Sequence, residues 1–144
     1  MKTFLRSLML MVTALAISAC SNNKETIETI EGSAFYLQRI AMPPNAKLVV
    51  SLDDVTLDNG SFISIDRQTF ATEAQAMPLQ FSFKVPADKI EQDKVYALSA
   101  SLQTADGQTV FATKDTYPVL TDANKTAKVE LQLFSYPAVT PAAE

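Results

Sequence analysis

The sequence predicts an all-β domain built as an antiparallel β-sandwich of about seven or eight strands. Three observations favour this class. Apolar and polar residues alternate with period two along several short stretches, as in strands that bury one face. Turn-forming residues separate these stretches, and no window keeps the 3.6-residue period of an amphipathic helix. Many short strands in roughly 100 residues are typical of a sandwich with Greek-key connections.

The first strands are expected between residues 35 and 65. Phe35–Ile40 and Phe62–Ile65 are short and weakly patterned. Between them, residues 48–52 place their apolar side chains in one phase, whereas residues 55–57 follow the opposite phase. A strand changes phase by one residue only at a bulge or a break, so we expect one at Asp53-Asp54.

The segment Ser64–Met77 has no clear period and is either an edge strand or a connecting loop. An edge strand could bind an extended partner peptide by adding it to the sheet. Residues 79–85 then form the cleanest strand of the sequence, with four apolar side chains on one face. Ala87–Gln92 has room for one helical turn at most.

The last strands are predicted over residues 96–102 and 129–133, which alternate in the same way. Asp106-Gly107 is a hairpin signal, because glycine readily adopts the positive φ that tight turns need. Asp93-x-x-Tyr96 resembles the tyrosine corner of immunoglobulin-like sandwiches. The alternative is that Tyr96 is simply an aromatic residue of the core.

The N-terminus reads as a secretory signal that ends in the single cysteine. Lys2 and Arg6 precede an apolar run over residues 7–17, too short to cross a bilayer as a helix. The following Ser18-Ala19-Cys20 resembles the lipobox of bacterial lipoproteins. That resemblance implies cleavage between Ala19 and Cys20, a diacylglyceryl group on the thiol and an acyl chain such as palmitate on the new N-terminus.

Four regions follow from this pattern. Residues 1–19 are the signal peptide, residues 20–31 the lipidated cysteine with a flexible polar tether, residues 32–134 the sandwich and residues 135–144 a disordered tail. Ser21 follows the cysteine, where lipoproteins retained in the inner membrane typically carry Asp. We therefore expect a lipid-anchored protein of the outer membrane, with its domain facing the periplasm.

Composition excludes several functions. Removal of Lys2 and Arg6 with the signal changes the formal net charge from −4 to −6, and no basic cluster marks a nucleic-acid site. The chain has no histidine, which is the commonest general base and metal ligand. The cysteine is committed to lipid. We expect no catalytic residues, no metal and no cofactor beyond the covalent lipid on Cys20.

Two residue groups are candidate sites. Asp53, Asp54 and Asp58 could bind a divalent cation, but their spacing lacks the order of a calcium loop and favours a solvated turn. Ser99 and Ser101 alternate on a predicted strand with no base nearby in the sequence, which argues against a nucleophile.

Arg39 and Asp54 are the candidate partner-binding residues. Arg39 precedes Pro43-Pro44 and has two possible roles. It is either a structural residue paired with an acid such as Asp54, which we favour, or an exposed group that binds a partner's carboxylate.

The order of motifs resembles the YbaY/YscW family of bacterial lipoproteins. The densest match is Arg39-Ile40-Ala41-Met42-Pro43-Pro44-Asn45-Ala46 followed by Leu48-Val49-Val50-Ser51-Leu52-x-Asp54-Val55, and it continues through Asp106-Gly107 and Tyr117-Pro118-Val119-Leu120-Thr121. Asn45 replaces the usual Gly, which a turn tolerates.

The resemblance implies a non-catalytic β-sandwich that acts as a pilotin, a chaperone for an outer-membrane secretin. The alternative is a lipoprotein that binds an envelope polysaccharide or another glycan. Without tryptophan, sugar stacking would depend on Tyr or Phe, which weakens that alternative.

Overall fold

The computed structural model describes residues 25–57, 59–73, 75–120 and 128–137, and these form one all-β domain. The signal peptide, Ala19, Cys20 and residues 138–144 of the predicted tail lie outside the described residues. The elements are β1 (Ile27–Tyr36), β2 (Lys47–Asp54), β3 (Ile63–Ala71), β4 (Leu79–Pro86), the 3-10 turn η1 (Ala87–Lys89), β5 (Tyr96–Gln103), β6 (Thr109–Ala112), β7 (Tyr117–Val119) and β8 (Val129–Ser135).

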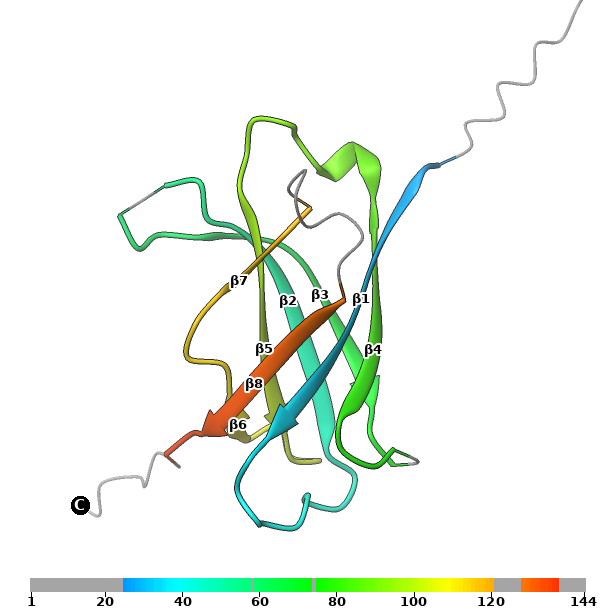
Figure 1. The fold of residues 1–144 in the computed structure, drawn as a ribbon, viewed down its shortest axis with the longest axis vertical. Helices are drawn as coiled ribbons and strands as arrows, with labels where there is room; N and C mark the ends of the chain where they lie inside the picture. Colours follow the sequence, from blue (N-terminus) through cyan, green and yellow to red (C-terminus); the bar gives the residue numbers. More distant parts are fainter. Residues whose placement is uncertain (1–24, 58, 74, 121–127, 138–144) are drawn as a thin grey trace, which may run out of the picture.

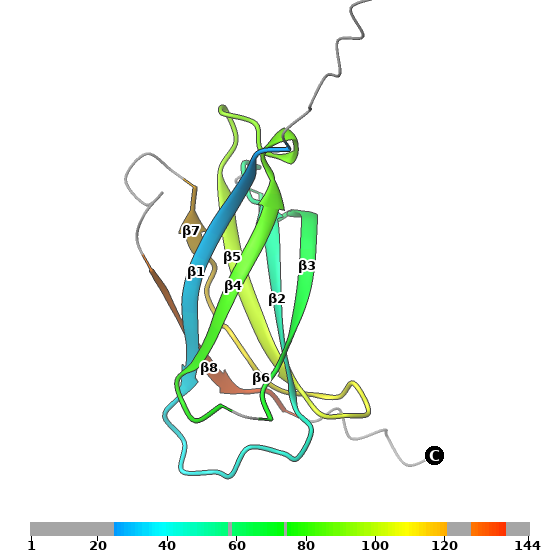
Figure 2. The same cartoon turned by 90° about the vertical axis from the view of Figure 1, so that its right-hand side faces the viewer.

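Hydrogen bonds connect the eight strands into one sheet of order β3-β2-β5-β6-β8-β1-β4, with β7 paired to β5. The sheet curls so that β8, β1 and β4 lie across β2, β3 and β5 (Figures 1 and 2). The all-β class is therefore confirmed. The immunoglobulin-like division into two sheets stays a prediction, because the strands form a single path.

The core lies inside the curl and follows the predicted alternation. On β4, Leu79, Phe81, Phe83 and Val85 are buried and the residues between them face solvent. β2, β5 and β8 contribute further buried side chains, including Leu52, Leu98, Leu102, Leu131 and Leu133. Burial of such side chains contributes about 1.5–3 kcal/mol each. The hydrophobic pattern therefore fixes which face of the sheet turns inward.

The first strand starts earlier than the sequence suggested. We expected a tether as far as residue 31 and a strand over Phe35–Ile40, but β1 begins at Ile27 and ends at Tyr36. Residues 27–34 pair antiparallel with β4, and residues 32–36 pair parallel with β8. The expected boundary at residue 32 is wrong. Residues 27–32 of β1 expose their charged side chains and bury only Ile30 and Gly32, so their sequence resembles that of a polar tether.

Three local predictions are confirmed. The β2–β3 register shifts between Leu52 and Asp53, where the phase change required a bulge. Gly107 has φ +84° in the turn between β5 and β6. The hydroxyl of Tyr96 accepts a hydrogen bond from the backbone N–H of Glu91 at 2.9 Å, which is the upstream contact expected of a tyrosine corner.

An open seam separates β3 from β4, the two ends of the strand path. The poorly patterned segment is thus an edge strand as far as Ala71 and a loop beyond it. The side-chain amide of Gln68 crosses the seam: its Nε2 donates to the carbonyl of Lys84, and its Oε1 accepts from the N–H of Lys84. One side chain therefore takes the place of a peptide group between the two edges.

Among the described residues, no helix has the length and apolar character needed to span a membrane.

Candidate functional site

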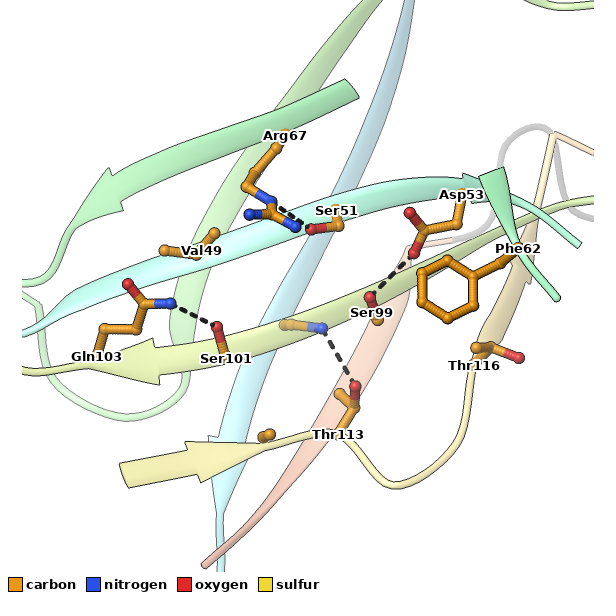
Figure 3. Close-up of a pocket in the computed structure, with 12 residues that line it drawn as sticks. Val49, Ser51, Asp53, Phe62, Arg67, Ser99, Ser101, Gln103, Thr113 and Thr116 are labelled. Carbon is orange, nitrogen blue, oxygen red and sulfur yellow. Dashed lines mark hydrogen bonds between the residues drawn. The ribbon is translucent and has the colours of Figure 1, made fainter. Parts of the chain in front are cut away.

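A shallow groove lies on the outer face of the sheet, across β3, β2, β5 and β6 (Figure 3). Its volume is about 350 Å³, within the range of small-ligand sites. We call it the polar groove, because most of the residues that line it have polar side chains: Ser51, Asp53, Arg67, Ser99, Ser101, Gln103, Thr113 and Thr116, with Phe62 at one end.

The polar groove exists because small side chains form its floor. Ser51 of β2 lies directly opposite Ser99 of β5, and Val49 lies opposite Ser101. Their neighbours along each strand point into the core and are buried, so this face carries only the short side chains. Longer groups stand at its rim, where Arg67 of β3 faces the floor from one side (Figure 3).

Hydrogen bonds hold the polar groups of the groove in place. Oγ of Ser99 donates to Oδ2 of Asp53 at 3.2 Å, and Nε of Arg67 donates to Oγ of Ser51 at 3.1 Å. Nε2 of Gln103 donates to Oγ of Ser101 at 3.3 Å. The groove therefore presents a carboxylate, a guanidinium and several hydroxyls from an ordered sheet. These groups can bind a polar ligand of either charge or a peptide main chain.

Phe62 gives the polar groove an apolar end. Its side chain is 67% exposed, and Figure 3 shows the ring beside the Asp53 carboxylate. Phe62 precedes β3 and belongs to the turn that joins β2 to β3. An exposed aromatic ring beside hydrogen-bonding groups is a common feature of protein and carbohydrate contacts.

Asp54, the next residue of β2, faces a different set of neighbours. Its Oδ1 accepts hydrogen bonds from the backbone N–H of Thr56 at 3.0 Å and from the Thr56 hydroxyl. Its Oδ2 lies 3.4 Å from Nζ of Lys94, which also lies 2.8 Å from Oε1 of Glu91. These contacts tie the end of β2 to the loop that precedes β5.

The same contacts shift two pKa values. The hydrogen bonds from Thr56, with help from Lys94, lower the pKa of Asp54 below its ordinary value. The carboxylates of Glu91 and Asp54 raise the pKa of Lys94. Asp54 and Lys94 are therefore both charged at neutral pH, as a structural ion pair requires.

The expected pair between Arg39 and Asp54 is not formed. Arg39 is exposed in the β1–β2 connection, at the opposite end of β2 from Asp54. The structural role that we assigned to this pair belongs to Lys94 and Asp54 instead. The sequence could not show which cation pairs with Asp54, because Arg39 and Lys94 both lie in connections next to strands and only the folded chain brings Lys94 to the end of β2. A partner-binding role for Arg39 and Asp54 stays a prediction.

The acidic cluster does not converge on one point. Asp53 and Asp54 are consecutive in a strand and point to opposite faces, one toward Ser99 and the other toward Thr56 and Lys94. Asp58 lies outside the described residues. Within the described part of the chain, no group of three acidic, histidine or cysteine side chains could hold a metal ion.

Ser99 and Ser101 are placed for hydrogen bonding. Ser99 donates to Asp53, and Ser101 accepts from Gln103. Neither contact supplies the imidazole or amine base that serine nucleophiles use.

The sequence shows the alternation of these two serines, but it does not show that Phe62, Arg67 and Gln103 are their neighbours. The available signal was the pair of small polar residues at alternate positions of β5, Ser99 and Ser101, where outward positions usually carry longer side chains.

Comparison with known proteins gives a consistent result. Residues 25–133 match the family model described as type III secretion system lipoprotein chaperone, YscW. An uncharacterized lipoprotein of Escherichia coli strain K12, YbaY, is 23% identical over 139 residues, which cover 82% of this chain and 73% of that protein.

A solved structure shares the fold. The alternative pilotin from the type II secretion system of Vibrio cholerae matches with a TM-score of 0.70 and 34% identity, covering 78% of this chain and 100% of that chain. The family model covers almost the whole described domain, β1 to β8. The chain therefore belongs to the YscW family of type III secretion system lipoprotein chaperones.

Proposed function

We propose that this chain is a pilotin-like lipoprotein that binds a segment of an outer-membrane secretin and brings it to the outer membrane. The anchor is a lipid on Cys20, and the polar groove is the client site. The observation that carries the proposal is the match of nearly the whole domain to a lipoprotein chaperone family, together with the solved pilotin of the same fold.

The site's chemistry supports a binding role rather than catalysis. The groove is open and lies on a rigid sheet, and its hydroxyls, amide, carboxylate and guanidinium can pair with main-chain and side-chain groups of a client. Phe62 adds an exposed apolar contact at one end of the groove. Affinity would then depend on how well a client segment fills the floor between Arg67 and Thr113.

A groove-filling variant tests this site. Ser101→Tyr places a ring on the floor of the polar groove, whereas Ser82→Tyr adds the same ring to an exposed position of β4, a strand that does not line the groove. In cells that depend on this protein, we expect Ser101→Tyr to abolish assembly of the secretin ring and Ser82→Tyr to preserve it. Equal secretin assembly in both variants would place the client site elsewhere.

The anchor requires a separate test. Cys20→Ala removes the thiol, so we expect a soluble periplasmic form or an uncleaved precursor instead of an outer-membrane protein. Palmitate labelling of the wild type and fractionation of both forms measure this. Unchanged fractionation together with unlabelled wild type would contradict the proposed anchor.

One feature favours a second candidate, an envelope glycan. The exposed Phe62 ring beside a carboxylate could stack on the apolar face of a sugar while Asp53 and Arg67 bind its polar groups. Binding of purified envelope glycans to wild type and Phe62→Ala decides this candidate. Glycan binding that is lost in Phe62→Ala, with secretin assembly intact in Ser101→Tyr, would favour it over the pilotin role.

A further inference from the structure

Exposed apolar side chains gather at one end of the sheet. The strand register defines this end, because Ile27 pairs with Pro86 and Asp54 pairs with both Ile63 and Tyr96. The start of β1, η1 and the β2–β3 turn all lie there, at the upper end of Figure 1. Three large apolar side chains outside the polar groove are exposed on the β2–β3 side of this end, and we call them the apolar tip: Leu57 (57%), Ile63 (57%) and Val95 (43%).

Hydrogen bonds give the apolar tip an ordered base. The N–H of Val55 donates to the carbonyl of Val95 at 2.8 Å, and the N–H of Val95 donates to Oγ1 of Thr56 at 3.0 Å. The loop before β5 is thereby joined to the end of β2. An apolar patch that the fold orders but does not bury is typical of an interaction surface.

The position of the chain start indicates what covers the tip. The described chain begins at Glu25, next to β1, and Cys20 precedes it by five residues. Five residues span at most about 18 Å when fully extended. The lipid on Cys20 therefore holds this end of the domain close to the bilayer, whereas the far end of β2 lies about 23 Å further along the strand. Such a short link gives even a weak contact a high effective concentration.

The charges nearby favour an apolar contact over an electrostatic one. Asp88, Lys89, Glu91 and Asp93 are exposed at the same end, on the η1 side, and three of these four are acidic. A surface of this kind does not attract anionic lipid as a polybasic segment does. Leucine, isoleucine and valine side chains instead partition into the boundary between headgroups and acyl chains.

We propose that the apolar tip rests in the surface of the bilayer that holds the lipid anchor. This inference depends on the lipidation of Cys20 in the proposed function. The contact orients the domain: the Phe62 end of the polar groove lies next to the lipid, and the groove extends away from the membrane along β2 and β5. A client segment would then be bound upright, beside the membrane into which its assembly inserts.

Because the chain has no tryptophan, single tryptophans can report the contact. Leu57→Trp labels the apolar tip, and Leu37→Trp is the matched control, since Leu37 is 72% exposed in the β1–β2 connection at the opposite end. The full lipidated protein is reconstituted into zwitterionic phospholipid vesicles with brominated acyl chains, and flotation is measured first. We expect the bromolipid to quench Leu57→Trp several-fold more than Leu37→Trp, with little change in high salt.

The outcomes separate the two proposals. Protein that floats but shows equal, weak quenching at both tryptophans overturns the membrane contact and leaves the anchor standing. Protein that fails to float overturns the anchor and the contact together. Quenching that appears only with anionic lipid and disappears in salt would show an electrostatic contact and would also overturn the inference. Shielding of Leu57→Trp by an added secretin segment, without lipid quenching, would assign the tip to the client instead.

Discussion

Substitution of Gly32 by alanine tests how closely the strands around β1 are packed. Gly32 lies between Val129 of β8 and Phe81 of β4. A Cβ atom at this position would lie 2.4 Å from the Val129 carbonyl oxygen and 2.6 Å from Cζ of Phe81. Ordinary contact begins at 3.4 Å, so the carbonyl oxygen would have to move by about 1 Å.

The expected cost follows from these contacts. Overpacking of a well-packed core destabilises by about 1–3 kcal/mol, and one of the two clashes here is with backbone that cannot rotate away. Replacing glycine in a strand recovers roughly 0.5–1 kcal/mol of backbone entropy. We therefore expect Gly32→Ala to lower the free energy of unfolding by about 1–2 kcal/mol, and the melting temperature by roughly 5–10 °C.

Urea denaturation and thermal melting, both followed by circular dichroism on the chain from residue 21, measure this effect. Gly60→Ala is the control, because a Cβ there has nothing within 4 Å and meets only the strain of φ +78°. Gly32→Ala combined with Phe81→Leu should recover part of the loss by removing one clash. A Gly32→Ala protein as stable as the wild type would refute the close approach of β8 to β1.

Three further perturbations test other parts of the structure. Asp54→Asn should reduce the loss of stability on acidification, because Thr56 and Lys94 lower the pKa of Asp54 in the folded protein. The contribution of the Asp54 carboxylate to stability is present above the unfolded pKa near 4 and is lost as the pH falls through the folded pKa. An unchanged profile of unfolding midpoint against pH would contradict this. Phe83→Ala removes a fully buried ring and should cost about 3–5 kcal/mol in urea denaturation, with a smaller loss arguing that the core collapses around the cavity. Gln68→Ala should open the β3–β4 seam, raising amide hydrogen exchange in β4 while that in β5 stays slow; equal exchange with the wild type would show that the amide does not hold the seam.

The sequence predicted the parts of the fold that depend on period-two burial. β4, β5 and β8 were located correctly because one face of each is entirely apolar, and the bulge beside Asp53 was located because the phase of burial changes there. β1 was placed too late because its first half is polar on its outer face and buries little. That half is a strand because it pairs with β4, and no pattern within residues 27–34 predicts this pairing.

The site was harder to predict, because it depends on cross-strand register. Ser51 and Ser99 are far apart in the sequence, and only their pairing in adjacent strands makes them one floor. Lys94 likewise contacts Asp54 because β2 and β5 end together, a proximity that sequence spacing does not show. Family resemblance, in contrast, was visible from the order of motifs and agrees with the match over residues 25–133.

Two consecutive residues link the polar groove to the apolar tip. Asp53 points into the polar groove and binds Ser99, whereas Asp54 points to the other face and binds Thr56 and Lys94 at the base of the apolar tip. Because β2 continues directly into the turn that carries the tip, a displacement of this turn by the bilayer would be transmitted to Asp53 and Phe62 at the upper end of the groove. The groove's affinity for a client should therefore differ between membrane-bound and soluble protein. Asp54→Asn, which loosens the base without changing any residue of the groove lining, should reduce that difference.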